Sequence, residues 1–138
     1  MAYTDDTPMK ALLAGMATVE PAACQAFARR QHRSGHADEL AAAAALIHEL
    51  AFNVQLDRPD ELVRWKYPES FEPIDTDMLV RLLQAASDDD RDTAHDIIAA
   101  ESFTTVTALS SIATHLRQSI EHIQRYGGQA SDPQQSLF

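Results

Sequence analysis

Apolar residues recur every three or four positions along most of the chain, which is the spacing of a helix that buries one face. No run of β-branched residues lies between turn residues in the way that a strand would require. The pattern therefore predicts an all-α protein, a bundle of five or six helices. We expect these helices at residues 7–17, 19–33, 38–56, 75–87 and 91–126, the last being one element or two that are divided near Ser102.

Two segments depart from the helical pattern. Residues 57–77 contain Pro59, Pro68 and Pro73, which predicts an irregular, proline-rich crossover with one short helical turn at residues 60–65. Residues 127–138 begin with two glycines and are rich in polar and turn-forming residues, which predicts a flexible C-terminal tail. The expected organisation is thus a helical domain at residues 1–126 followed by a tail at residues 127–138.

Two of the predicted helices carry clear apolar seams. The seam of the helix at 38–56 consists of Leu40, Ala43, Ile47, Leu50 and Val54. The seam of the last helix consists of Val106, Leu109, Ala113, Leu116, Ile120 and Ile123. Alternating steps of three and four residues are typical of helix-on-helix packing. Whether the second seam packs inside the chain or forms a homodimer is left open.

Composition and charge exclude several classes of function. The net charge is −10 with eleven Lys and Arg, too few for a surface that wraps nucleic acid nonspecifically. Cys24 is the only cysteine, so neither an internal disulfide nor a Cys-based zinc site is expected. No apolar stretch reaches 18 residues and no export signal begins the chain, so we expect no membrane span and a cytoplasmic location. No metal or cofactor is expected.

The segment "RRQHR" at residues 29–33 concentrates positive charge in an acidic chain. Arg29, Arg30 and Arg33 are candidates for contact with a phosphate or an acidic partner. Cations near the C-terminus of a helix also stabilise its dipole without any ligand. Both interpretations are kept.

The segment "RWKYP" at residues 64–68 places Trp65 and Tyr67 in the crossover, with Phe71 close behind. Aromatic side chains on a loop stack on bases or anchor a partner protein. They also cover small cores from outside. Trp65 and Tyr67 are therefore the second candidate surface for a partner of the helical body.

Residues 117–122 read Arg-Gln-Ser-Ile-Glu-His. This segment resembles the motif of HEPN-domain ribonucleases, helical bundles of similar length in which four to six residues separate an arginine from a histidine. The resemblance implies that Arg117 and His122 act on an RNA phosphodiester at a dimer interface. Gln118 departs from the residue that usually follows the arginine in that family.

Residues 134–138 read Gln-Gln-Ser-Leu-Phe. This pentapeptide resembles the motif by which bacterial polymerases and repair proteins dock on the ring-shaped DNA sliding clamp; Gln135 stands where leucine is common. The resemblance implies that Gln134, Ser136, Leu137 and Phe138 contact the clamp, with the last two entering a shallow apolar cleft.

These observations predict a non-catalytic accessory or regulatory protein of bacterial or phage DNA replication or repair that binds the sliding clamp. A second protein is expected to bind the helical body. Two alternatives are kept: a HEPN-like ribonuclease, and an acidic protein that neutralises a basic or DNA-binding partner.

Overall fold

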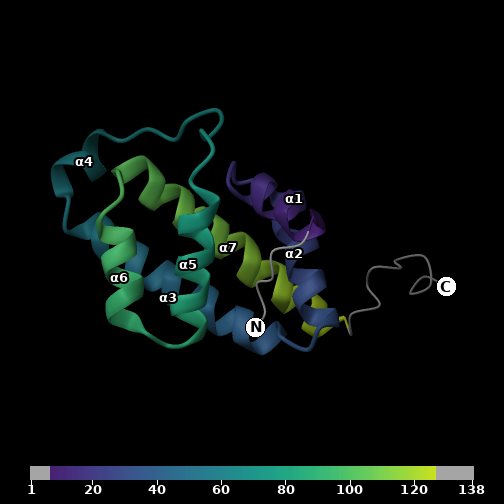
Figure 1. Ribbon diagram of the computed structural model, residues 1–138. Coiled ribbons are helices and arrows are strands. Elements are labelled where there is room, and N and C mark those ends of the chain that lie inside the picture. Colours follow the sequence, from purple (N-terminus) through teal and green to yellow (C-terminus); the bar gives the residue numbers. More distant parts are fainter. Residues whose placement is uncertain (1–6, 127–138) are drawn as a thin grey trace.

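A computed structural model describes residues 7–126, and every secondary-structure element in this range is a helix (Figure 1). The helices are α1 (Thr7–Met16), α2 (Pro21–Arg33), α3 (Ala37–Leu56), α4 (Pro59–Arg64), α5 (Thr76–Ser87), α6 (Arg91–Ala99) and α7 (Phe103–Arg125). The all-α bundle is therefore confirmed. The described helices include α4, expected as a short turn, and they divide the region from residue 91 at Ser102 into α6 and α7.

Helices α3 and α7 form the central pair of the bundle and run in opposite directions (Figure 1). Near one end of the pair, Gln55 Nε2 donates a hydrogen bond to Thr107 Oγ1 at 3.0 Å. Near the other end, Gln124 Nε2 donates to Asp38 Oδ1 at 3.0 Å. Residue numbers thus rise along α3 as they fall along α7, which makes the pair antiparallel.

The remaining long helices cover this pair on two sides. Helix α2 packs against α7 and carries α1, whereas α5 and α6 pack against α3 and against each other (Figure 1). The buried apolar side chains of all these helices form one continuous core. The largest of those fully buried are Met9, Met16, Phe27, Leu40, Leu79, Leu82, Leu83, Ile98, Leu109, Leu116 and Ile120.

Both predicted seams are buried, as their spacing indicated. All five seam residues of α3 and all six of α7 belong to the core. The α7 seam packs within the chain, against α2 and α3, so it is not available as a face for a homodimer. Self-association through another surface stays a prediction.

Short polar side chains at the helix starts explain where α5, α6 and α7 begin. Asp75 accepts from the backbone N–H of Asp77 at 3.0 Å, and Asp90 accepts from that of Thr93 at 3.2 Å. The Ser102 hydroxyl likewise accepts from the N–H of residue 105 at 3.2 Å. Each bond satisfies an N–H that has no partner inside its helix, and such caps stabilise a helix by about 1 kcal/mol.

The second helix begins at Pro21 and not at residue 19, where the sequence pattern placed it. Helix α1 ends at Met16, and Val19 follows in the left-handed region with φ of 61°. A β-branched residue adopts this conformation at a cost, but the Val19 side chain is buried in the core. Tertiary packing therefore decides this boundary.

Within the described part of the chain, no helix combines the length and apolar character that crossing a membrane requires.

Candidate functional site

The predicted clamp-docking residues Gln134, Ser136, Leu137 and Phe138 lie outside the residues that the structure describes. The last described residue is Tyr126, which follows the C-terminus of α7. The docking motif and the division of the chain into body and tail consequently stay predictions.

The arginines of "RRQHR" lie in the final turns of α2. Arg29 and Arg33 are exposed, whereas Arg30 is half-buried and takes part in contacts within the chain. The negative end of the α2 dipole lies beside these side chains, which is the arrangement expected of stabilising cations. The geometry therefore agrees with the dipole interpretation and adds no ligand-binding feature here.

Arg117 and His122, the residues of the HEPN-like motif, are both exposed on α7. Five positions along a continuous α-helix correspond to a rotation of about 140° around its axis, so the two side chains leave the helix in different directions. The His122 ring packs against Tyr126, with ring centroids 4.8 Å apart. One chain thus does not bring this arginine and this histidine together.

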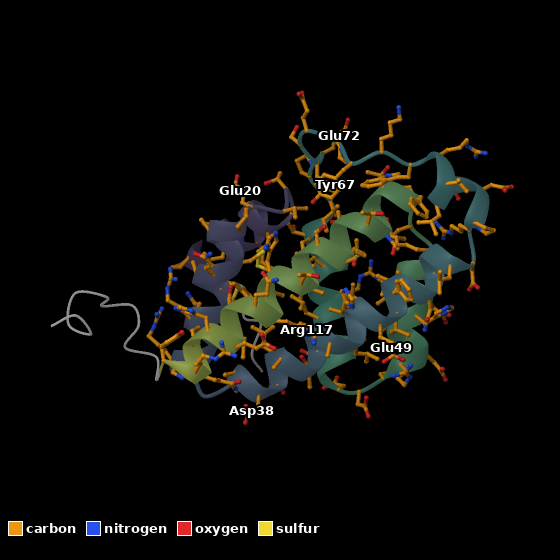
Figure 2. All side chains as sticks on the ribbon, turned by 180° about the vertical axis from the view of Figure 1, so that it is seen from behind. Glu20, Asp38, Glu49, Tyr67, Glu72 and Arg117 are labelled. Atoms are coloured by element: carbon orange, nitrogen blue, oxygen red, sulfur yellow. The ribbon has the colours of Figure 1, made fainter. Side chains whose placement is uncertain are left out.

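The crossover that follows α4 lies over α7 and is held there by its aromatic side chains (Figure 2). Trp65 Nε1 donates to Thr104 Oγ1 at 3.3 Å, and the Tyr67 hydroxyl lies 3.3 Å from the Ser111 hydroxyl. Phe71 is buried in the core, whereas Tyr67 is 64% exposed. The aromatic cluster therefore covers part of the core and also presents a ring to solvent.

The aromatic rings of the crossover contact one another in a continuous series. Tyr67 meets Trp65 edge to face with centroids 5.5 Å apart, and meets Phe71 in the same way at 5.3 Å. Trp65 also packs against Phe103, the first residue of α7, at 6.1 Å. Aromatic pairs of this geometry contribute about 0.5–1.5 kcal/mol each beyond the area they bury. These contacts hold Trp65 in place at the start of α7.

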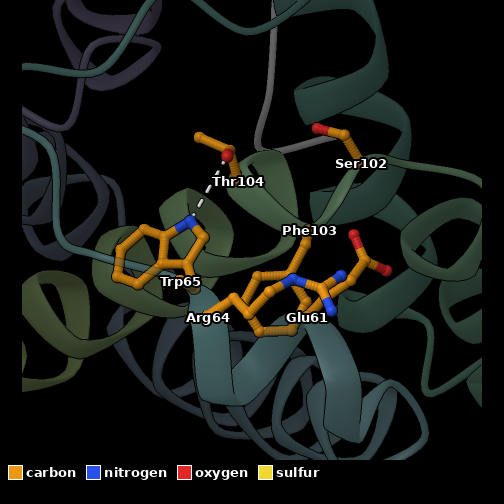
Figure 3. Close-up of a pocket in the computed structure, with 6 residues that line it drawn as sticks. All are labelled: Glu61, Arg64, Trp65, Ser102, Phe103 and Thr104. Atoms are coloured by element: carbon orange, nitrogen blue, oxygen red, sulfur yellow. Dashed lines mark hydrogen bonds between the residues drawn. The ribbon is translucent and has the colours of Figure 1, made fainter.

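A shallow cavity of about 280 Å³, wide open to solvent, lies beside Trp65, between α4 and the first turn of α7 (Figure 3). Its lining consists of Glu61, Arg64, Trp65, Ser102, Phe103 and Thr104. Trp65 provides most of the apolar surface, because Phe103 is buried beneath it, and a guanidinium, a carboxylate and two hydroxyls provide polar groups. Because it is small and wide open to solvent, it is a surface depression and not an enclosed small-molecule site.

The charges around this cavity have opposite signs. Arg64 is exposed and forms no ion pair with any residue in the range 7–126. The first turn of α7 adds partial positive charge, because its N–H groups point out of the helix end. Glu61 contributes the opposing carboxylate.

The sequence pattern indicated Trp65 and Tyr67 but not the other residues of this cavity. Arg64 is part of "RWKYP", yet nothing in the sequence shows that it faces Ser102, Phe103 and Thr104. Those residues come almost forty positions later, and only the packing of the crossover on α7 brings the two segments together. The sequence indicated that a helix starts near Ser102. It did not indicate that Arg64 lies across the cavity from this residue.

Cys24 is fully buried in α2, and burial raises the pKa of its thiol to about 12. Nucleophilic and metal-binding cysteines react as thiolates, which this environment disfavours. Cys24 therefore acts as a small apolar core residue. Over residues 7–126, no group of three or more His, Cys, Asp or Glu side chains is arranged to hold a metal ion.

Comparison with known proteins found no matching family model, no similar curated protein and no similar solved structure.

Proposed function

We propose that this chain is a cytoplasmic, non-catalytic accessory or regulatory protein of bacterial or phage DNA replication or repair. It docks on the DNA sliding clamp through the pentapeptide at residues 134–138. The observation that carries the proposal is the residue pattern itself, in which Gln134, Ser136, Leu137 and Phe138 match the clamp-binding motif.

The chemistry of these side chains suits a shallow cleft on another protein. Leu137 and Phe138 are adjacent, and burying each would contribute about 1.5–3 kcal/mol before ordering costs. Gln134 offers both a donor and an acceptor that set the register at the edge of the cleft. A short peptide with two such anchors binds with a dissociation constant of about 1 μM, which lets partners exchange on the clamp.

Two properties of the chain are compatible with a role through protein contacts. The described core extends from Met9 to Ile123, so the residues that form this apolar interior all precede the pentapeptide. The net charge of −10 opposes direct binding to DNA, so contact with a protein ring that encircles DNA is the more favourable route to it.

The test is a titration of a purified bacterial clamp with the full chain and with the double variant Leu137→Ala, Phe138→Ala. We expect the double variant to bind at least about a hundredfold more weakly, because both apolar anchors are lost. The double variant Leu62→Ala, Val63→Ala is the matched control, because it also removes two adjacent exposed apolar side chains. A chain that ends at Pro133 should bind the clamp as weakly as the Leu137→Ala, Phe138→Ala variant. Equal affinity of the clamp for the full chain, the variants and the truncated chain would contradict the proposal.

A further inference from the structure

One side of α3 faces solvent and carries two large apolar side chains. Phe52 and Leu56 lie one helical turn apart on it, and each is 52% exposed. Ala45 precedes Phe52 by two turns and is also exposed. At about 100° per residue, these three positions lie along one line of the helix together with Ala41 and His48, within an arc of about 80°. We call these five residues the α3 stripe.

The neighbouring helices leave the α3 stripe open. Gln55 bonds to Thr107 of α7 on one side of it, and Glu49 Oε2 lies 2.6 Å from Arg91 Nη2 of α6 on the other. Helices α5 and α6 lie in front of α3 in Figure 1, so the open side of α3 is the one seen in Figure 2, where Glu49 is labelled. Exposed apolar side chains that line up along a helix are typical of a face that packs against another helix.

The segment that carries the stripe is nearly free of charge. Residues 40–56 contain a single Asp, Glu, Lys or Arg, which is Glu49, although charged residues make up 23% of the chain. Glu49 already pairs with Arg91 within the chain. Two copies with a net charge of −10 repel each other most where exposed carboxylates meet, so the α3 stripe is a surface at which a second copy approaches with little repulsion.

The order of large and small side chains along the stripe is complementary to itself. When two α3 helices lie antiparallel about a two-fold axis between positions 48 and 49, position 45 of each copy stands opposite position 52 of the other, and position 41 stands opposite position 56. Both pairs then join an alanine to a large apolar side chain: Ala45 to Phe52, and Ala41 to Leu56. Each contact occurs twice in a two-fold interface, and large side chains set against small ones interdigitate.

This self-complementarity favours a second copy of the chain as the occupant of the stripe. A strongly charged partner, such as a nucleic acid, finds no counter-charge there. Two large side chains per copy expose much less than the roughly 800 Å² that each partner buries in a standard interface. The expected dimer is therefore weak, with a dissociation constant of about 10–500 μM.

We propose that the α3 stripe is the interface of a homodimer, in which the α3 helices of two copies pack antiparallel and Phe52 of each copy lies on Ala45 of the other. The interface belongs to the helical body and leaves the buried α7 seam inside each chain. It does not depend on the clamp-docking pentapeptide.

Sedimentation equilibrium of the full chain, from about 1 μM to about 1 mM, measures the association. We expect the average mass to rise with concentration from one chain to two and not beyond, because a two-fold interface is closed. Phe52→Ala should weaken the dimer about tenfold or more, since the side chain is lost from both symmetric contacts. Val63→Ala is the matched control, because it truncates an apolar side chain that is 82% exposed on α4, and it should change the affinity by less than about twofold.

A charge placed on the stripe should prevent association. Ala45→Glu sets a carboxylate against Phe52 of the other copy at both contacts, so we expect no dimer up to about 1 mM. Ala22→Glu makes the same substitution at an exposed position of α2 and should leave the dimer nearly unchanged.

An exchange of sizes tests the register. Ala45→Phe sets two phenylalanines against each other, and Phe52→Ala sets two alanines against each other, so each variant alone should dimerise about tenfold more weakly. A mixture of the two should form a heterodimer in which each phenylalanine again meets an alanine, with an affinity within about threefold of that of the natural homodimer. The double variant Ala45→Phe, Phe52→Ala should likewise dimerise.

Several results would overturn the proposal. One is the mass of a single chain at about 1 mM, with circular dichroism showing the chain folded. Others are equal weakening by Phe52→Ala and Val63→Ala, or a mixture of the size variants that associates no better than either alone. Loss of self-association in the Leu137→Ala, Phe138→Ala variant would assign the association to the C-terminal residues instead. Clamp binding by Ala45→Glu should be unchanged, so failure of this proposal and failure of the clamp proposal are distinguishable.

Discussion

The guanidinium of Arg58 donates from Nη2 to the backbone carbonyl oxygen of Ala99 at 2.8 Å, across 41 positions of the chain. Its Nη1 donates to the carbonyl oxygen of Glu101, also at 2.8 Å. The last carbonyl groups of a helix have no partner inside it, so one arginine satisfies the end of α6 and joins it to the α3–α4 junction. These contacts also fix the segment that leads into the first turn of α7, where the cavity lies.

Replacing Arg58 should therefore destabilise the fold. Arg58→Met keeps most of the apolar stem but removes both hydrogen bonds, and we expect a loss of about 2 kcal/mol in the free energy of unfolding. Urea denaturation followed by circular dichroism measures this loss. Arg81→Met, at an exposed position, should change the free energy of unfolding by less than about 0.5 kcal/mol. Equal effects of the two substitutions would show that the Arg58 contacts contribute little.

At Gly15, helix α1 lies close to α2. A Cβ atom added at residue 15 would lie 2.6 Å from the Cβ of Ala23, which has no flexible side chain to move aside. Gly15→Ala should lower the free energy of unfolding by about 1–2 kcal/mol, because overpacking outweighs the better helix propensity of alanine. In the double variant Gly15→Ala, Ala23→Gly the clash is absent, so the measured coupling between the two substitutions should be favourable. Additive effects in thermal unfolding would contradict the close approach.

Asp89 occupies the turn between α5 and α6 with φ of 58°, in the left-handed region. Asp89→Gly removes the steric cost of this conformation and one negative charge from a run of three aspartates, so it should stabilise the protein by about 0.5–1 kcal/mol. The matched control is Asp88→Gly. Asp88 has φ of −85° and accepts hydrogen bonds from Gln84, so its loss should destabilise the protein. Chemical denaturation of the two variants should give changes of opposite sign.

The buried thiol of Cys24 predicts a specific dependence of stability on pH. Burial raises its pKa from 9.0 to about 12, so the unfolded chain releases this proton at a lower pH than the folded chain does. The contribution of the buried, protonated Cys24 thiol to the free energy of unfolding is therefore complete below pH 9. It is lost as the pH rises from 9 towards 12. Unfolding measured at several pH values should show a steeper decline for the natural chain than for Cys24→Ala. The natural thiol should also react with a thiol reagent only as fast as the chain unfolds.

The position of Arg117 and His122 on α7 makes a prediction about RNA. Their side chains leave the helix about 140° apart, which is unfavourable for contact of both with one phosphodiester within a single chain. We expect purified protein to leave a labelled single-stranded RNA intact over hours, at concentrations at which light scattering shows a monomer. Cleavage that disappears in His122→Ala but persists in His115→Ala would instead support the ribonuclease alternative.

The sequence alone was sufficient to predict most of the helical body. Seams such as Leu40 to Val54 and Val106 to Ile123 follow the helical period, and periodicity is a local property that each segment carries by itself. The proline-rich crossover and the break before α7 had equally local causes, in Pro59, Pro68 and the capping residue Ser102. The start of α2 was misplaced by two residues, because the left-handed conformation of Val19 depends on the core into which its side chain packs.

What the sequence determined by itself was therefore the helical class and the faces that are buried, and its last five residues are the basis of the proposed clamp partner. What only the tertiary structure decided was the meeting of distant segments: Arg58 at the end of α6, and Arg64 with Trp65 at the start of α7. Helix formation is encoded in neighbours three and four positions apart. A cavity between α4 and α7 depends instead on how the antiparallel α3–α7 pair packs, and no local pattern records that arrangement.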